Sequence, residues 1–210
     1  LSAETGAVVA ILRDEGWLTD LRTALAGAIA TRAGMRADAR RIGIVGAGTQ
    51  ARFQIRAAAH LLREQEPLFA VWGRSPEKLE ALRHDLAGEG IAVEPVADLE
   101  ALCAQSDALI TVTPAAAPII RDDWIRPGTH ITALGADAPG KQELDSALVA
   151  LADTRIADSL EQSLYHGEFA AAAAVGLIDA GDCVELGAVL AGDVPSRRSD
   201  DDITIADLTG

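Results

Sequence analysis

The sequence of 210 residues is long enough for one large domain, or for one domain with an additional segment. It carries 18 basic and 32 acidic residues, a formal net charge of −14. This balance argues against nucleic acid or an anionic membrane as a partner, because phosphate binding relies on clustered Lys and Arg.

Two further features point to a protein of the cytoplasm. The longest apolar run, Phe169 to Ile178, is about half of the roughly 20 residues that a membrane-spanning helix needs. The first residues, which include Glu4, do not resemble a signal peptide.

Cys103 and Cys183 are far apart and lack a C-x-x-C pair or a His at ligand spacing. We therefore expect small buried hydrophobes in a reducing compartment, with no disulfide and no metal site.

The N-terminal part of the chain predicts a strand and a helix. Ala7 to Leu12 is β-prone, and Thr19 is a suitable N-cap. Apolar side chains then recur at helical spacing up to about Ala33: Leu18, Leu21, Leu25, Ala28 and Ile29. The Ala- and Arg-rich stretch Ala33 to Arg40 is the best candidate for a domain boundary.

Short apolar runs and helical segments alternate along the rest of the chain. The expected strands are Arg41–Val45, Leu68–Trp72, Ile91–Glu94, Ala108–Thr111, His130–Ala133 and Thr154–Ala157. The expected helices are 49–63, 75–88, 98–104 and 159–174. Unbroken apolar runs separated by helices are typical of a parallel sheet covered on both faces. The pattern predicts a doubly wound, mostly parallel α/β sheet of the Rossmann type.

A glycine-rich motif follows the first strand of this alternation. The segment from Gly46 to Ala51 reads G-x-G-x-x-A and opens a helix, the context in which this motif binds a dinucleotide. Gly46 allows the tight turn, and Gly48 lacks the Cβ that would block a pyrophosphate. The N–H groups and the dipole at the helix start would then hold the phosphates. The alternative is an ordinary glycine-rich turn.

The end of the second strand bears on the choice of cofactor. An acid at this position normally binds the ribose 2′-hydroxyl of NAD. Here the segment reads Trp72-Gly73-Arg74-Ser75, without an acid. Arg74 could bind a 2′-phosphate and Ser75 could hydrogen-bond to it, which favours NADP(H) while leaving NAD(H) possible. The alternative is that Ser75 only caps its helix and Arg74 is solvated.

Two further positions suggest chemistry. Asp137 and Lys141 lie in a loop at the carboxyl end of a predicted strand, the edge at which open α/β sheets bind ligands. Asp137 is therefore a candidate acid/base, or alternatively it forms an Asx-turn before Pro139. Arg22 lies within the apolar stripe of the first helix, where its side chain either extends to solvent or receives an anion such as a substrate carboxylate.

These motifs together resemble one family. The segments 46–51, 72–78, 135–144, 185–187 and 202–205 are similar to the ornithine cyclodeaminase/mu-crystallin family, and the Gly-Ala-Asp-x-Pro-Gly-Lys-x-Glu-Leu run is specific to it. The resemblance spans essentially the whole chain. It implies a Rossmann domain with a separate substrate and dimerisation domain, a homodimer, and chemistry at the Cα–N bond of an amino acid.

The resemblance also implies roles for individual residues. Asp137 would be the proton donor and acceptor, and Arg22 would bind the substrate carboxylate near the nicotinamide. Thr209 would line the substrate pocket, and this position together with Leu208 departs from the Ser and Val of many members. Gly73 stands where NAD-using relatives carry the ribose-binding acid. The implied cofactor contacts are Arg22, Gly46, Gly48, Thr49, Gln50, Gly73, Arg74, Ser75, Thr113, Leu134, Gly135, Ala136, Lys141 and Leu208.

The resemblance divides the chain and sets its expected function. We expect residues 1–35 to be a remnant of the substrate domain, 36–200 the NAD(P)-binding domain, and 201–210 the start of the return to the substrate domain. The chain would then be a piece of a longer protein and inactive alone; a processed or renumbered complete chain is the alternative. The expected activity is an NAD(P)(H)-dependent oxidoreductase on an amino acid or imine. Ornithine cyclodeaminase and a non-catalytic NADP-binding protein are the alternatives.

Overall fold

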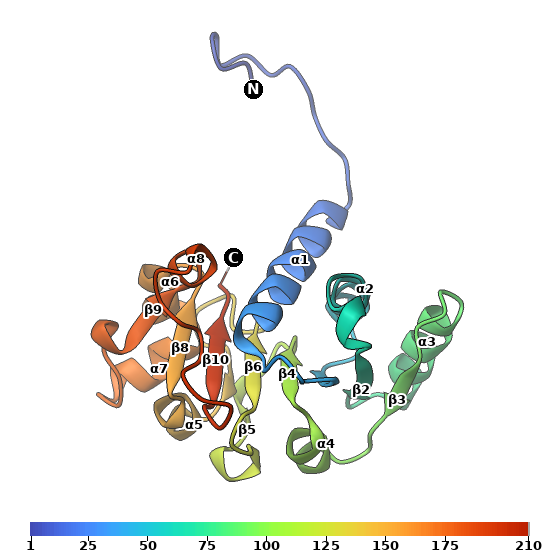
Figure 1. The fold of residues 1–210 in the computed structure, drawn as a ribbon. Coiled ribbons are helices and arrows are strands. Elements are labelled where there is room, and N and C mark those ends of the chain that lie inside the picture. Colours follow the sequence, from blue (N-terminus) through green and yellow to red (C-terminus); the bar gives the residue numbers. More distant parts are fainter. Residues whose placement is uncertain (210) are drawn as a thin grey trace.

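Eight parallel strands form the central sheet of the structure, a computed structural model that describes residues 1–209 (Figure 1). Across the sheet their order is β3-β2-β1-β4-β6-β10-β8-β9. The strands are β1 (Arg41–Val45), β2 (Leu68–Trp72), β3 (Val93–Pro95), β4 (Ala108–Thr111), β6 (His130–Ala133), β8 (Thr154–Ala157), β9 (Cys183–Glu185) and β10 (Thr204–Asp207). β5 (Ala116–Ile120) and β7 (Gln142–Leu144) form a separate parallel pair.

Helices cover both faces of this sheet. They are α1 (Trp17–Gly34), α2 (Thr49–Leu61), α3 (Pro76–Ala87), α4 (Leu99–Gln105), α5 (Ser146–Leu151), α6 (Leu160–His166), α7 (Glu168–Ala174) and α8 (Leu186–Ala191). One apolar cluster joins Ile44 of the sheet to α2 and α3, and a second joins Leu109 to α4, α5 and α7. The predicted doubly wound α/β fold is therefore confirmed.

The strands are aligned so that their carboxyl ends form one row. Val45 pairs with Trp72 on one side and Thr111 on the other, and the row continues through Ala133 and Asp207. Chain order reverses between β1 and β4, because β1, β2 and β3 run in one direction across the sheet and the later strands in the other. In open α/β sheets, ligands bind in the crevice at this reversal.

The last strand lies inside the sheet, which differs from the expectation that the C-terminal strand belongs to a second domain. Residues 201–210 were expected to lead away into a second domain, but β10 pairs with β6 on one side and β8 on the other. All four residues of β10 are buried. A short apolar strand flanked by two parallel neighbours satisfies its backbone hydrogen bonds on both sides, which explains its place inside the sheet.

Two other expectations about elements are also wrong. Residues 7–12 form no strand, and their apolar side chains Val8, Val9, Ile11 and Leu12 are 67–80% exposed, on a segment that projects from the body (Figure 1). A strand needs a partner, and this segment has none within residues 1–209. The single helix expected over 159–174 is interrupted at Gly167, because the chain there is extended and separates α6 from α7.

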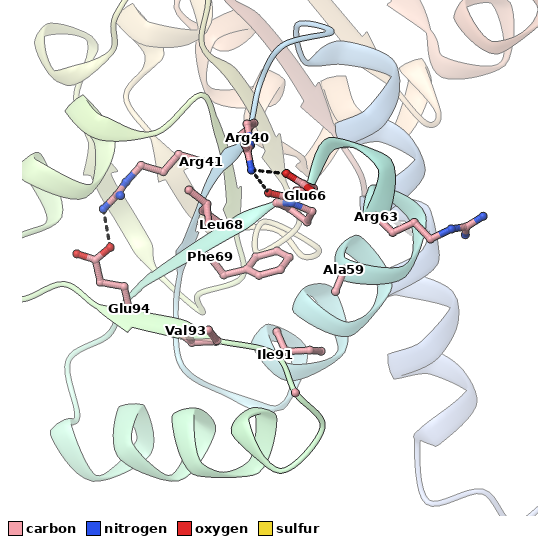
Figure 2. Close-up of a pocket in the computed structure, with 13 residues that line it drawn as sticks. Arg40, Arg41, Ala59, Arg63, Glu66, Leu68, Phe69, Ile91, Val93 and Glu94 are labelled. Carbon is pink, nitrogen blue, oxygen red and sulfur yellow. Dashed lines mark hydrogen bonds and ion pairs between the residues drawn. The ribbon is translucent and has the colours of Figure 1, made fainter.

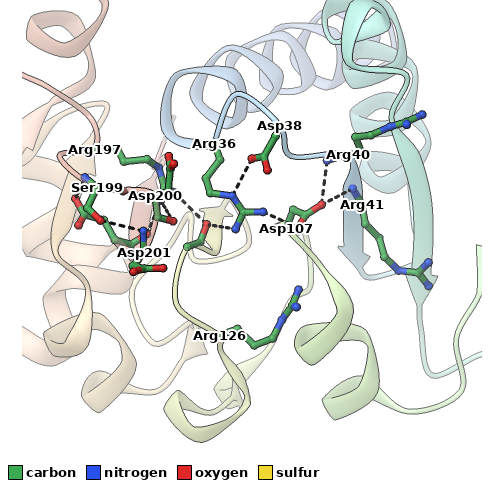
Figure 3. A network of polar contacts seen from close by, with 12 residues as sticks. Arg36, Asp38, Arg40, Arg41, Asp107, Arg126, Arg197, Ser199, Asp200 and Asp201 are labelled. Carbon is green, nitrogen blue, oxygen red and sulfur yellow. Dashed lines mark hydrogen bonds and ion pairs between the residues drawn. The ribbon is translucent and has the colours of Figure 1, made fainter.

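The amino ends of the strands are held by a polar network (Figure 3). The Asp107 carboxylate accepts hydrogen bonds from the backbone N–H groups of Arg40 and Arg41 and from the Arg36 guanidinium. Arg197 donates to the carbonyl oxygens of Gly34 and Gly128. These contacts tie α1 and the loop before β10 to the amino edge of the sheet, opposite the edge at which the predicted site lies.

Cys103 is buried, Cys183 is half-buried, and both are free thiols. Burial raises the pKa of Cys103 to about 12. No helix within residues 1–209 is long and apolar enough to cross a membrane.

Candidate dinucleotide site

The glycine-rich turn after β1 is shaped for close approach of a ligand. Gly46 has a φ of +123°, and a Cβ there would lie 3.1 Å from the carbonyl oxygen of Val112. A Cβ on Gly48 would meet no protein atom within 4 Å, so packing within residues 1–209 does not explain this glycine. It leaves open the space that a pyrophosphate needs in a G-x-G turn.

The start of α2 suits an anion. The helix begins at Thr49 after Gly48, with no side-chain cap and no acidic residue in its first turn. Its first N–H groups therefore keep their hydrogen-bonding capacity and the positive end of the helix dipole. Together with the open space at Gly48, these features fit a dinucleotide phosphate bridge.

A cavity of about 440 Å³ adjoins this turn. It lies between the loops that follow β1, β2 and β4. Its lining residues are Gly46, Ala47, Gly48, Trp72, Gly73, Arg74, Ser75, Lys78, Val112, Thr113 and Pro114. Six of the residues predicted to bind the cofactor are thus brought together: Gly46, Gly48, Gly73, Arg74, Ser75 and Thr113. A cavity with backbone donors, an aromatic ring and two cations fits the adenosine half of a nicotinamide dinucleotide.

The turn after β2 combines capping with ligand-facing groups. Ser75 caps α3 by accepting a hydrogen bond from the Lys78 N–H, and its hydroxyl donates to Glu77 at 2.7 Å. This hydrogen bond lowers the pKa of Glu77. Arg74 is exposed at the cavity. Gly73 is required for packing, because a Cβ there would lie 2.8 Å from that of Ala47.

The loop after β6 carries the candidate acid/base. Leu134, Gly135 and Ala136 are buried, whereas the Asp137 side chain is 57% exposed and pairs with the Lys141 ammonium. β6 lies two strands from β1, so the start of this loop is about 10 Å from the start of the glycine-rich turn. The two loops can therefore face the two halves of one dinucleotide.

A buried carboxylate joins the loops after β4 and β6. Glu143 of β7 accepts hydrogen bonds from the Thr111 hydroxyl, from both the N–H and the hydroxyl of Thr113, and from the Gly135 N–H, all at 2.6–2.8 Å. Burial raises the pKa of Glu143, while these four donors act in the opposite direction. Sequence reasoning used this residue only as part of the family motif and missed the contact, because its donors come from distant strands.

The end of β10 closes the row of loops. Leu208 and Thr209 are buried, and Thr209 donates hydrogen bonds from its N–H and its hydroxyl to Asp158 at the end of β8. The Thr209 hydroxyl also lies 3.1 Å from the carbonyl oxygen of the Gln162 side chain. Leu208 and Thr209 thus lie at the same edge as Asp137, because they directly follow β10, which pairs with β6.

Two further residues predicted to contact ligands lie on α1 or against it. Arg22 is exposed and lies off the buried stripe of α1, which consists of small residues from Ala24 to Gly34 that allow α1 to approach α2 and the sheet. The Gln50 side chain donates to Asp20 of α1 at 2.8 Å, so its amide group links the two helices. Gly27 explains this close approach, since a Cβ there would collide with Gln54.

A larger cavity, of about 650 Å³, lies at the amino edge of the sheet (Figure 2). Phe69, Ile91 and Val93 form its apolar part. Its Arg40 pairs with Glu66 and its Arg41 with Glu94, so two of its cations are already neutralised. It is remote from the row of strand ends that carries the predicted site residues, and within residues 1–209 no group of three or more His, Cys, Asp or Glu could hold a metal.

The fold and this edge define a Rossmann-type dinucleotide-binding domain. The model of the ornithine cyclodeaminase/mu-crystallin family matches residues 1–210, and the chain belongs to this family. The resemblance inferred from the motifs is therefore confirmed.

Three relatives illustrate the similarity. The iminosuccinate reductase of Paracoccus denitrificans is 41% identical over 193 residues, 92% of this chain and 59% of the relative. Its crystal structure in complex with NAD⁺ gives a TM-score of 0.84 over the same shares of the two chains. The alanine dehydrogenase of Archaeoglobus fulgidus is 36% identical over all of this chain and 63% of the relative.

The third relative is known from its structure. The Δ1-pyrroline-2-carboxylate reductase of Thermococcus litoralis, in complex with NADH and L-proline, gives a TM-score of 0.90 at 30% identity. The match covers 99% of this chain and 64% of that one. The chain thus spans less than two thirds of the length of each of these relatives.

Proposed function

We propose that the protein is an NAD(P)(H)-dependent oxidoreductase that acts on the C–N bond of an amino acid or imine. The observation that carries the proposal is the row of strand ends, which places the open turn at Gly48 and the Asp137–Lys141 pair at one edge. The reductases and the dehydrogenase among its relatives support the same reaction class.

The residues at this edge would have separate roles in the reaction. The nicotinamide, when bound, supplies a hydride to the carbon of the imine or accepts one from the amino acid. Asp137 would give a proton to the reacting nitrogen, or take one from it, while Lys141 orients the carboxylate through their ion pair. Arg22 would bind the substrate carboxylate, and Leu208 and Thr209 would form the far wall of the pocket.

The cofactor proposed is NADP(H) in preference to NAD(H). Arg74 and Lys78 both line the cavity beside Ser75, and none of the ion pairs within residues 1–209 uses either cation. Two uncommitted cations and a hydroxyl suit a 2′-phosphate. NAD(H) remains the alternative, since Glu77 holds the Ser75 hydroxyl and two structural relatives were solved with NAD⁺ or NADH.

We also propose a homodimer for the full-length protein, in which a second domain supplies the rest of the substrate pocket. The apolar side chains of residues 8–12, with Trp17 and Leu18, are exposed at the start of α1. Apolar surface of this extent is normally covered in an interface. Light scattering of the full-length protein coupled to size exclusion should give twice the mass of one chain; the mass of a single chain would contradict the dimer.

The function is tested with full-length protein, NADPH or NADH, and a panel of cyclic and acyclic imines with an adjacent carboxylate. Loss of absorbance at the nicotinamide band with any imine supports the reductase. Ammonia release from ornithine without net change of the cofactor selects a cyclodeaminase instead. Dinucleotide binding without turnover of any substrate selects the non-catalytic binding protein. We expect residues 1–210 alone to bind dinucleotide but to be inactive.

A further inference from the structure

Glu143 contacts both loops that flank the centre of the candidate site. Its Oε1 accepts from the N–H and the hydroxyl of Thr113, each at 2.7 Å. Its Oε2 accepts from the Thr111 hydroxyl at 2.6 Å and from the Gly135 N–H at 2.8 Å. One carboxylate therefore fixes the loop after β4 to the loop after β6, and Asp137 follows only two residues after Gly135.

The two loops are in direct contact at this point. A Cβ on Gly135 would lie 2.2 Å from the carbonyl oxygen of Thr113 and 2.4 Å from the carboxyl carbon of Glu143. Such close approach leaves no room for one loop to shift independently of the other. The position of Asp137 relative to Thr113 is thus set where Glu143 binds both loops.

Glu143 is itself held from behind. Glu168, the first residue of α7, accepts hydrogen bonds from the N–H groups of Glu143 and Leu144 at 2.7 and 2.9 Å. Glu143 and Glu168 are both fully buried, and no ion pair within residues 1–209 includes either of them. Burying a carboxylate without a cation costs free energy of desolvation. The four hydrogen bonds that the Glu143 carboxylate accepts must therefore supply most of the compensation.

We propose that Glu143 is a positioning residue that sets where the nicotinamide half of the bound dinucleotide lies relative to Asp137. This inference rests on the proposed function. The cavity assigned to the adenosine half is formed mostly by the turns at Gly46–Gly48 and Trp72–Ser75. The Glu143 carboxylate accepts from Thr111, Thr113 and Gly135, and of these three only Thr113 lines that cavity. Loss of the Glu143 carboxylate should therefore weaken binding of the nicotinamide half of the cofactor more than binding of the adenosine half.

Glu143→Gln in full-length protein tests this, because the amide has the shape of the carboxylate but cannot accept at both positions. Isothermal titration calorimetry would compare the dinucleotide that the wild-type protein binds with its adenosine half, ADP or 2′-phospho-ADP. We expect the Kd of the dinucleotide to rise tenfold or more and that of the adenosine half to rise less than threefold. At saturating cofactor, kcat should also fall, and Glu143→Asp should recover part of the loss.

Asp107→Asn is the matched control. Asp107 also accepts two backbone N–H groups of another strand, but at the amino edge of the sheet. The Asp107→Asn protein should be less stable than wild type, but neither Kd should change more than threefold. If Glu143→Gln does not fold, Thr111→Val removes one buried donor to Glu143 and should shift the two Kd values in the same unequal way.

If Glu143→Gln raises both Kd values equally, or raises neither by more than Asp107→Asn does, Glu143 only supports the fold and the inference is overturned. A wild-type protein that binds neither dinucleotide nor adenosine half would overturn the proposed function itself. The two failures are thus distinguishable.

Discussion

Asp137 is largely exposed, whereas three other carboxyl groups at the carboxyl edge, those of Glu143, Glu168 and Asp207, are buried. A group that exchanges protons with a substrate must reach it, and Asp137 alone of these four extends from a loop beyond the strand ends. Its pairing with Lys141, four residues later, restrains the side chain without burying it. This exposure supports its proposed role as the acid/base.

Asp137→Asn should lower kcat about 100-fold or more, because an amide cannot exchange the proton, while cofactor affinity stays within threefold of wild type. Steady-state kinetics with an imine from the panel that the wild-type protein reduces, and calorimetry with the dinucleotide, measure the two effects. Asp123→Asn, at an exposed carboxylate paired with Arg121, is a control for the lost charge. An active Asp137→Asn protein would refute the assignment.

Arg74→Ala should weaken NADPH binding roughly 10- to 100-fold, the contribution of one or two charged hydrogen bonds, and NADH binding much less. The ratio of the two Kd values is the measurement. Arg83→Ala, on α3 but paired with Glu80 away from the cavity, should change neither. Equal losses for the two cofactors would contradict a 2′-phosphate site at Arg74.

The elements predicted best are strands that lie mostly buried within the sheet. β1, β2, β4, β6 and β8 have the predicted bounds because a strand covered on both faces is an unbroken apolar run. β5, β7, β9 and the short helices α5 and α8 were not anticipated, since they have few residues and mixed exposure. Their positions depend on distant partners, which a local pattern does not encode.

The site likewise contains residues that the sequence could predict and residues that it could not. The glycine-rich turn, the end of β2 and Asp137 could be located because each follows a recognisable strand. The roles of Glu143 and Lys78 could not, since one acts through hydrogen bonds to two distant loops and the other becomes visible only as part of a cavity wall. Arg22 was expected within the apolar stripe of α1 but lies outside the buried stripe, because small residues, and not Leu21 or Leu25, form it; its exposure agrees with the alternative that the side chain extends to solvent.

The break between α6 and α7 is a requirement of packing. A Cβ on Gly167 would lie 2.2 Å from Oδ2 of Asp207, which is buried. Gly167→Ala should therefore lower the free energy of unfolding by about 1–3 kcal/mol, the usual cost of overpacking. Gly187→Ala in α8, where a Cβ meets nothing within 4 Å, should be neutral or slightly stabilising. Denaturant unfolding compares the two; equal effects would argue against the clash.

At the scale of the whole molecule, three buried carboxyl groups make stability depend on pH. Burial raises the pKa of Asp207 to about 7 and that of Glu168 to about 8, and it also raises the pKa of Glu143. The groups that face Asp207 are Glu168 and Asp158, which are also acidic, so ionisation of one opposes ionisation of another. The folded protein thus retains protons that the unfolded chain has released.

The sign of the dependence follows from this difference. Between about pH 4 and 8 these carboxyl groups bind more protons in the folded state than in the unfolded state, so the stability that they contribute falls as the pH rises. His130 acts in the opposite direction below about pH 6.5, because burial lowers its pKa to about 3. Each unit of pKa difference corresponds to about 1.4 kcal/mol. The Tm should fall between pH 6.5 and 8.5, and Asp207→Asn should flatten this decline. Asp193→Asn, at an exposed site, should leave the decline of Tm with pH unchanged. An equal decline in the wild-type and Asp207→Asn proteins would contradict the prediction.

The place of β10 also bears on how the chain folds during its synthesis. Within residues 1–209, β10 is the last strand in chain order, yet it lies between β6 and β8 (Figure 1). The half of the sheet from β3 to β6 can assemble while translation continues, because all of its strands have already emerged. β8 and β9 pair with each other, but they can join this half of the sheet only after β10 has been synthesised, because β10 is the strand that pairs with both β6 and β8.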